Sequence, residues 1–226
     1  MKSNYIINGF QRTVQERFSA QSKALNEACM RRLAQLRMEN KDASKEKQRH
    51  LEGQILPGIA VYETLKTVMT PEEAFRTVHG YVEAYALSAR KMLVGLLRLP
   101  ELYRLIPGIS VRMMHKIFNG AAGFAAKEYR TAGGVMRIDM VKCPYHETCV
   151  RYGCPELCAC FCDSDDIAYD NMHPKLLWHR TKTLGRGGDC CDFGLRVKGM
   201  YRKAEVKTVE GMAAFRCRKG KADAQG

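Results

Sequence analysis

The stretch VMRIDMVKCPYHETCVRYGCPELCACFC, residues 135–162, is where the pattern of this chain changes. Before it, apolar residues recur at steps of three and four, as is typical of helices. Within it, Met136, Ile138 and Met140 alternate with polar residues, which predicts a half-buried strand. The strand runs directly into a segment that holds six of the ten cysteines. The sequence therefore predicts an α+β protein, with a helical N-terminal part followed by a small antiparallel sheet and a cysteine-rich helical insert.

The helical part has one sharp boundary signal. Thr70 can cap a helix, Pro71 suits the first helical position, and Glu73 completes a capping box. The Met-rich stretch VRMMHKIF, residues 111–118, indicates a packing surface. The sequence predicts several helices in this part. They cover about residues 9–39, 43–69 with a bend near Pro57, 70–98, and 109–118.

A second β signal follows the cysteines. LLWHRTKTL and DCCDFGLRV flank a Gly-rich turn at 185–188, which predicts a β-hairpin on the same sheet. We expect residues 1–133 to form a helical region and residues 134–200 a cysteine-rich α+β region packed on it. Residues 201–226 are expected to form a basic, partly disordered tail.

Bulk composition limits the class of protein. The longest apolar run, MLVGLL at 92–97, is far below the roughly 20 residues of a membrane span. The N-terminus lacks the apolar region of a secretory signal. We therefore expect a cytoplasmic protein with no membrane partner. Structural disulfides are rare in that reducing compartment, which favours thiols, metal ligands or buried packing for the cysteines.

The net charge of +13 raises the question of an anionic partner. Residues 196–226 hold nine Lys/Arg and three Asp/Glu, so they supply nearly half of the excess. This segment has only Tyr201 and Phe215 as aromatic residues, so nucleic-acid binding is not favoured. A small anionic substrate suits the charge, and the sequence leaves open whether the chain forms a homo-oligomer.

The cysteine spacing contains no C-x2-C pair, on which zinc ribbons and ferredoxin-type clusters depend. A divalent metal bound by cysteines stays open, because thiolate sites need not follow a standard spacing. So does simple packing, because free cysteine is among the most buried residue types. No cofactor is certain from the sequence, and no metal ligand can be named.

A helix start in the cysteine segment is more informative. Pro155 suits a first helical position, and Cys158 and Cys162 then lie four residues apart on one face. Asp165 extends that face, whereas Cys160 points elsewhere. Because a helix N-terminus favours a thiolate, we expect the pKa of Cys158 to be lowered.

The hairpin supplies further candidates. Arg180 could bind a carboxylate through two hydrogen bonds. By strand alternation, Asp189 is expected to share the apolar face of Cys191, which makes it more notable than Asp192.

The pattern CPY…C…GCPELC..FC..D, followed by R.KTLG.GGDCCDF, resembles the L-2-amino-thiazoline-4-carboxylic acid hydrolase family over about residues 135–197. The hairpin is also similar, more distantly, to 4-vinyl-reductase-like ligand-binding domains. The first resemblance implies a hydrolase that opens a cyclic amidine, with water adding at the ring carbon, the carbon–sulfur bond breaking and a carbamoyl-cysteine resulting. The second implies the alternative, a non-catalytic small-molecule or metal-binding sensor domain.

Carried onto this chain, the hydrolase resemblance implies a catalytic group and a substrate-binding group of residues. Cys158 or Cys162 would be the thiolate nucleophile, and Asp165 would orient it or activate water. Arg180 would hold the substrate carboxylate. The substrate-binding residues expected in full are Glu156, Arg180, Thr183, Asp189 and Cys191.

Overall fold

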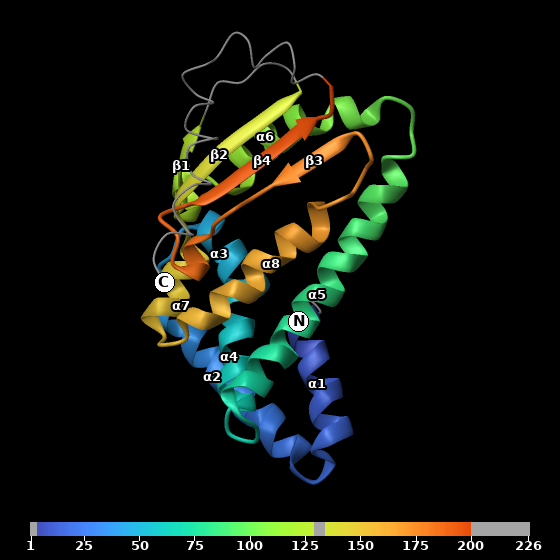
Figure 1. The fold of residues 1–226 in the computed structure, drawn as a ribbon. Coiled ribbons are helices and arrows are strands. Elements are labelled where there is room, and N and C mark those ends of the chain that lie inside the picture. The colour runs from blue at the N-terminus through green and yellow to red at the C-terminus, as the bar shows by residue number, and fades with distance from the viewer. Residues whose placement is uncertain (1–3, 129–133, 200–226) are drawn as a thin grey trace, which may run out of the picture.

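The computed structural model describes residues 4–128 and 134–199, and it has the predicted α+β architecture (Figure 1). Helices occupy the N-terminal part, and a four-stranded antiparallel sheet follows. The basic tail at 201–226 lies outside the described residues. The helices are α1 Tyr5–Arg17, α2 Ser22–Glu39, α3 Lys45–His50, α4 Leu56–Leu65, α5 Pro71–Leu96, α6 Ile106–Ile117, α7 Pro144–Arg151 and α8 Cys158–Tyr169; the strands are β1 Ala125–Glu128, β2 Val135–Lys142, β3 Leu176–His179 and β4 Cys191–Val197.

The prediction of one helix over 9–39 is wrong, because the chain breaks at Phe18 and passes through a 3₁₀ turn. Phe18 leaves the helical region of backbone space and packs its ring against the helical core. A continuous helix of that length would extend roughly 46 Å, beyond the core it has to cover. Broken at Phe18, both α1 and α2 contact α4.

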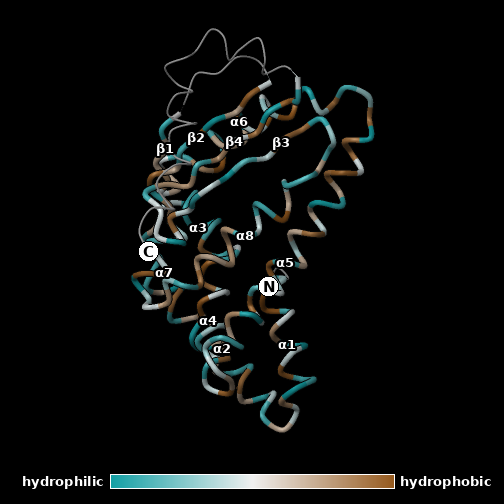
Figure 2. Tube along the Cα trace, viewed as in Figure 1, coloured by the Kyte–Doolittle hydropathy of each residue, from teal (hydrophilic) through white to brown (hydrophobic). Residues whose placement is uncertain are grey.

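The start of α5 is confirmed. The Thr70 hydroxyl accepts a hydrogen bond from the Glu73 amide at 3.2 Å, and the Glu73 carboxylate accepts one from the Thr70 amide at 3.1 Å. This capping box satisfies two backbone donors at once. Polar and apolar stretches alternate along α5 in Figure 2, which suits a helix with one face on the core.

The sheet has the order β1-β2-β4-β3, so β2 and β4 lie at its centre. The predicted strand at 135–142 and the predicted hairpin are both confirmed, with Ile138 opposite Phe193 and Trp178 opposite Leu195. Residues of α6 pack against the apolar face of this sheet. β1 precedes residue 134, the expected start of the α+β region, and pairs with β2.

Helix α8 connects the helical part and the sheet. Its Phe161 ring approaches Gly58 of α4 so closely that a Cβ there would lie 2.7 Å from the ring. Only glycine allows this contact, which presses α8 onto the helical core. Residues on the other side of α8 face the hairpin, so this helix can present side chains to both parts.

Candidate functional site

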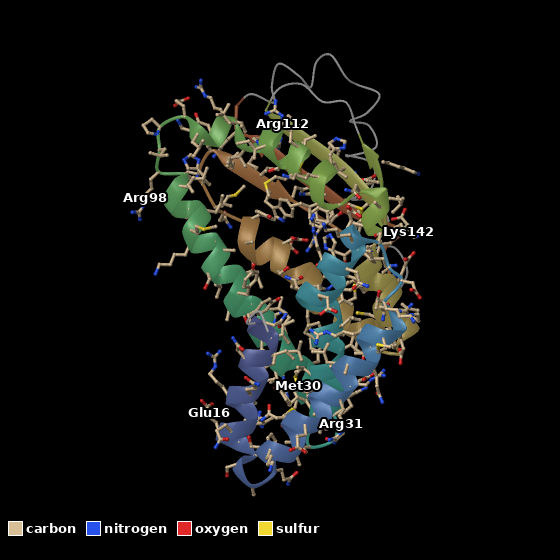
Figure 3. All side chains as sticks on the ribbon, turned by 180° about the vertical axis from the view of Figure 1, so that it is seen from behind. Glu16, Met30, Arg31, Arg98, Arg112 and Lys142 are labelled. Carbon is tan, nitrogen blue, oxygen red and sulfur yellow. The ribbon has the colours of Figure 1, made fainter. Side chains whose placement is uncertain are left out.

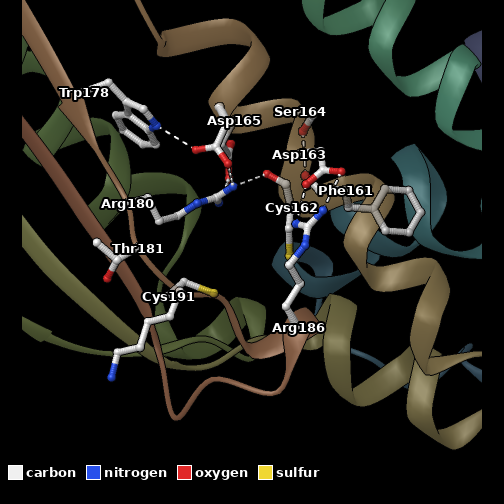
Figure 4. A network of polar contacts seen from close by, with 12 residues as sticks. Phe161, Cys162, Asp163, Ser164, Asp165, Trp178, Arg180, Thr181, Arg186 and Cys191 are labelled. Carbon is white, nitrogen blue, oxygen red and sulfur yellow. Dashed lines mark hydrogen bonds and ion pairs between the residues drawn. The ribbon is translucent and has the colours of Figure 1, made fainter. Parts of the chain in front are cut away.

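Three thiols meet where α8 faces the hairpin. Cys158 begins α8 and Cys162 follows one turn later, with 4.0 Å between the two sulfurs, so the predicted shared face is confirmed. Cys191, the first residue of β4, approaches from the sheet and accepts a hydrogen bond from the Leu184 amide at 3.3 Å. Figure 4 shows Cys162 and Cys191 on facing elements. Cys160 is fully buried on another side of α8, as expected.

The environment lowers the pKa of Cys162, which favours its thiolate form. The Cys158 thiol lowers the pKa of Cys162 most, followed by the Cys191 thiol, and together with the Arg180 charge they outweigh burial. The pKa values of Cys158 and Cys191 rise in turn, because each is held as a donor to Cys162. The expectation that the helix N-terminus lowers the pKa of Cys158 is therefore wrong. The neighbouring thiols have the largest effect on the pKa of Cys162.

The 3₁₀ turn Leu184–Arg186 of the hairpin covers the thiols. A Cβ on Gly185 would lie 3.0 Å from the sulfurs of both Cys158 and Cys162, so any larger residue would force the turn or the two cysteines to shift. Just before the turn, the buried Thr183 hydroxyl has no hydrogen-bond partner of ordinary geometry. It nevertheless lies near enough to help lower the pKa of Cys162. The site thus has a buried polar group without a satisfied partner.

Arg180 is buried beside α8, with only 1% of its side chain exposed. Nη2 donates to the Cys162 carbonyl at 2.6 Å and to Asp166 at 2.5 Å, while Nη1 donates to Asp165 at 3.2 Å (Figure 4). The guanidinium also lies 5.4 Å from the centre of the Phe193 ring. Both terminal nitrogens are therefore directed at α8, where they place positive charge beside the thiolate.

Asp165 has the electrostatics of a proton donor or acceptor. Burial raises its pKa to about 7, against the lowering effect of Arg180 and with a further rise from the Cys162 charge. Protein atoms surround the carboxylate, although 35% of the side chain surface remains exposed. At neutral pH such a carboxyl populates both protonation states. Its neighbour Asp166 accepts a hydrogen bond from the Trp178 indole at 2.8 Å.

Two predicted substrate-binding residues have polar partners other than the thiols. Glu156 is exposed and accepts a hydrogen bond from the Tyr62 hydroxyl at 2.6 Å. The expectation that Asp189 faces the apolar side is wrong, because its side chain is 73% exposed and pairs with Lys182. The strand begins only at Cys191, so its alternation does not extend back to 189. Of these two aspartates, Asp192 is the buried one.

The sequence did not identify a cluster of charges beside the site. Arg186, on the turn that covers the thiols, donates hydrogen bonds to the Asp163 carboxylate from both terminal nitrogens, one of them at 2.9 Å. His79 of α5 reaches the same carboxylate at 3.0 Å. These residues come from three separate segments, and only the Gly-rich setting of Arg186 could have drawn attention to it.

A metal site is a separate question. Across residues 4–128 and 134–199, no group of three or more His, Cys, Asp or Glu side chains is arranged to hold a metal ion. Within the same ranges, no helix combines the length and apolarity needed to cross a bilayer.

Comparison with known protein families matches residues 48–195 to the family described as L-2-amino-thiazoline-4-carboxylic acid hydrolase. The matched span runs from α3 into β4 and includes every residue of the thiol site. No curated protein matches the chain.

Proposed function

Because the chain belongs to the L-2-amino-thiazoline-4-carboxylic acid hydrolase family, we propose that it opens an amino-thiazoline carboxylate or a close cyclic amidine to a carbamoyl-cysteine. The family implies a hydrolase with a small-molecule substrate. The observation that carries the finer proposal is the Cys162 thiolate, held between two thiols and beside a buried arginine. A stabilised thiolate next to a titratable carboxyl is the pairing that nucleophilic opening of such a ring requires.

In the first step, the Cys162 sulfur attacks the ring carbon that joins nitrogen and sulfur. A bond forms between this carbon and Cys162, and the carbon–sulfur bond of the ring breaks. The departing ring sulfur takes a proton from Asp165, whose pKa of about 7 leaves it partly protonated at neutral pH. The product of this step is an amidine attached to Cys162 through sulfur.

In the second step, water attacks the same carbon, and the ionised Asp165 accepts a proton from it. The bond to Cys162 breaks, and the sulfur leaves as the thiolate that its surroundings favour. The released carbon carries the new oxygen as a carbamoyl group. The sum of both steps is the addition of one water molecule, with Asp165 and Cys162 restored.

Arg180 and Arg186 then have different roles. Both terminal nitrogens of Arg180 donate hydrogen bonds to groups on α8. We therefore assign Arg180 to stabilising the thiolate and orienting Asp165. We assign contact with the substrate carboxylate to Arg186, which lies on the turn above the thiols with 53% of its side chain exposed. To bind the substrate, Arg186 would exchange its bidentate pairing with Asp163 for one with the substrate carboxylate, a group of the same charge and geometry.

The test is an assay of thiol release from the amino-thiazoline carboxylate, with mass spectrometry of the carbamoyl product. Cys162→Ala is expected to lower kcat by about a thousandfold or more, because the nucleophile is lost. Cys160→Ala, on the same helix but facing the core, is the matched control and should stay near wild type.

Two outcomes would contradict the proposal at different levels. Full turnover by Cys162→Ala would mean that water attacks directly, and the nucleophile role would be wrong. No turnover by the wild-type protein, with or without divalent cations, would remove this substrate. Ligand binding without turnover would then favour the sensor alternative.

A further inference from the structure

The region from the second half of α5 to the end of α6 carries most of the large hydrophobic side chains that are exposed among the described residues. Nine of the 13 large hydrophobic side chains exposed among the described residues fall between 85 and 117. Surfaces with this concentration of apolar groups usually mark contact with a partner or a membrane. The nine are Tyr85, Leu87, Met92, Leu96, Leu99, Leu105, Ile109, Met113 and Ile117.

Helix α6 holds the most regular part of this surface. Leu105, Ile109, Met113 and Ile117 recur every four residues and are all exposed, so they form one stripe along the helix. We call these four residues the α6 stripe. A different side of α6 packs on the sheet, so the helix is apolar on two sides rather than one. The interpretation of VRMMHKIF as a packing surface thus holds for Met114 but not for Met113.

The charges around this surface are nearly all positive. Residues 85–117 contain six Lys/Arg and a single acidic residue. That residue, Glu101, already pairs with Arg104 at 2.5 Å. Arg112 and Lys116 lie three and seven residues after Ile109, on the same side of α6 as the stripe. Figure 3 shows Arg112 on α6 and Arg98 at the far end of α5.

We propose that the α6 stripe rests on an anionic lipid bilayer, with α6 parallel to the membrane plane. The apolar side chains would enter the headgroup boundary, and Arg112 and Lys116 would extend to lipid phosphates. This contact lies on the membrane and spans nothing, so it agrees with the lack of a spanning helix in the described residues.

Charge argues for a lipid surface over a second copy of the chain. Pairing two α6 stripes would bring Arg112 and Lys116 of both copies together, and like charges at close range repel. An anionic bilayer supplies the opposite sign over the whole surface and apolar material beneath it. Both properties of the stripe are then matched by one partner.

The test is co-sedimentation of the full chain with vesicles. One set contains phosphatidylcholine alone, and the other contains equal parts phosphatidylcholine and phosphatidylglycerol. We expect binding to the mixed vesicles at least about tenfold stronger than to the neutral ones, and weaker in high salt.

Variants locate the contact. Ile109→Gln with Met113→Gln should weaken binding to the mixed vesicles by about tenfold, with unchanged circular dichroism. Val150→Gln is the matched control, because Val150 on α7 is as exposed as Met113 but lies elsewhere. The basic tail is present in every protein compared.

Unchanged binding by the double variant, or equal binding to both vesicle types, would overturn the proposal. A wild-type protein that binds no vesicle but forms a dimer sensitive to the double variant would also overturn it, and would assign the stripe to a second copy.

Discussion

Cys160 and Cys162 are two residues apart on the same helix and have opposite properties. Cys160 faces the helical core, where burial raises its pKa to about 12, and its thiol donates a hydrogen bond to the Phe75 carbonyl at 4.0 Å. Cys162 faces two thiols and Arg180, and its pKa falls well below the usual range. A carbonyl only accepts hydrogen bonds and cannot stabilise a thiolate, whereas thiols donate. The direction in which a cysteine points from α8, more than its burial, therefore decides its reactivity.

Cysteines elsewhere in the helical core behave like Cys160. Burial raises the pKa of Cys29 to about 11, and the pKa of Cys149 is raised by its hydrogen bond with Cys154 and by burial. These thiols serve as small apolar groups in a packed interior. The difference in pKa between these cysteines and Cys162 can be tested with reagents that react with thiolates.

The largest expected effect is in alkylation. With iodoacetamide at pH 6, Cys162 should react more than about a thousandfold faster than Cys160, because only Cys162 is a thiolate at that pH. Peptide mass spectrometry after timed quenching measures both sites in one sample. Unfolding in denaturant is the control, and it should make the two rates similar. Equal alkylation rates of Cys160 and Cys162 in the folded protein would contradict the proposed difference in pKa.

Loss of Asp165 should have the next largest effect. A carboxyl with a pKa raised to about 7 is protonated below that pH, so the step that needs its proton weakens as pH rises through about 7. Asp165→Asn should lower kcat by about a hundredfold and abolish this alkaline decline. The pH profile of kcat checks this, with Asp170→Asn at the exposed end of α8 as control. An unchanged decline in Asp165→Asn would assign it to another group.

Gly185→Ala tests the turn over the thiols. Its new Cβ would meet both sulfurs at 3.0 Å and push the turn away from Cys162. We expect kcat to fall by about tenfold to a hundredfold, because small displacements of catalytic groups are costly. Gly80→Ala on α5 is the control, since nothing lies within 4 Å of a Cβ there. If Gly185→Ala keeps full activity, the turn takes no part in the reaction.

Arg180→Gln should have the smallest effect, a shift in the pH dependence of Cys162 alkylation. A purely structural role of Arg180 would not produce this shift. Removing the cation takes away one of the influences that lower the pKa of Cys162, so the pH of half-maximal alkylation should move upward. Arg137→Gln removes an ion pair in the sheet, with Asp139 at 2.8 Å, and should leave that pH unchanged. A shift of the same size in both variants would point to a general loss of structure.

Local patterns in the sequence predicted local structure well. The capping box at Thr70, the strand at 135–142, the hairpin and the shared face of Cys158 and Cys162 all depend on neighbours within a few residues. Interruptions were harder to predict. The break at Phe18 follows from what the two helices pack against, and the position of Asp189 follows from where the strand begins.

The sequence by itself determined the α+β class, the family resemblance and the segment that carries the thiols, because periodicity and motif spacing are properties of the chain. Only the tertiary structure decided that the pKa of Cys162 is lowered whereas that of Cys158 is raised, that Arg180 donates hydrogen bonds to α8, and that Arg186 pairs with Asp163. The pKa of a side chain depends on burial and on nearby charges and donors. In this protein α8, β4 and the turn at Gly185 supply them, and these segments meet only when the chain folds.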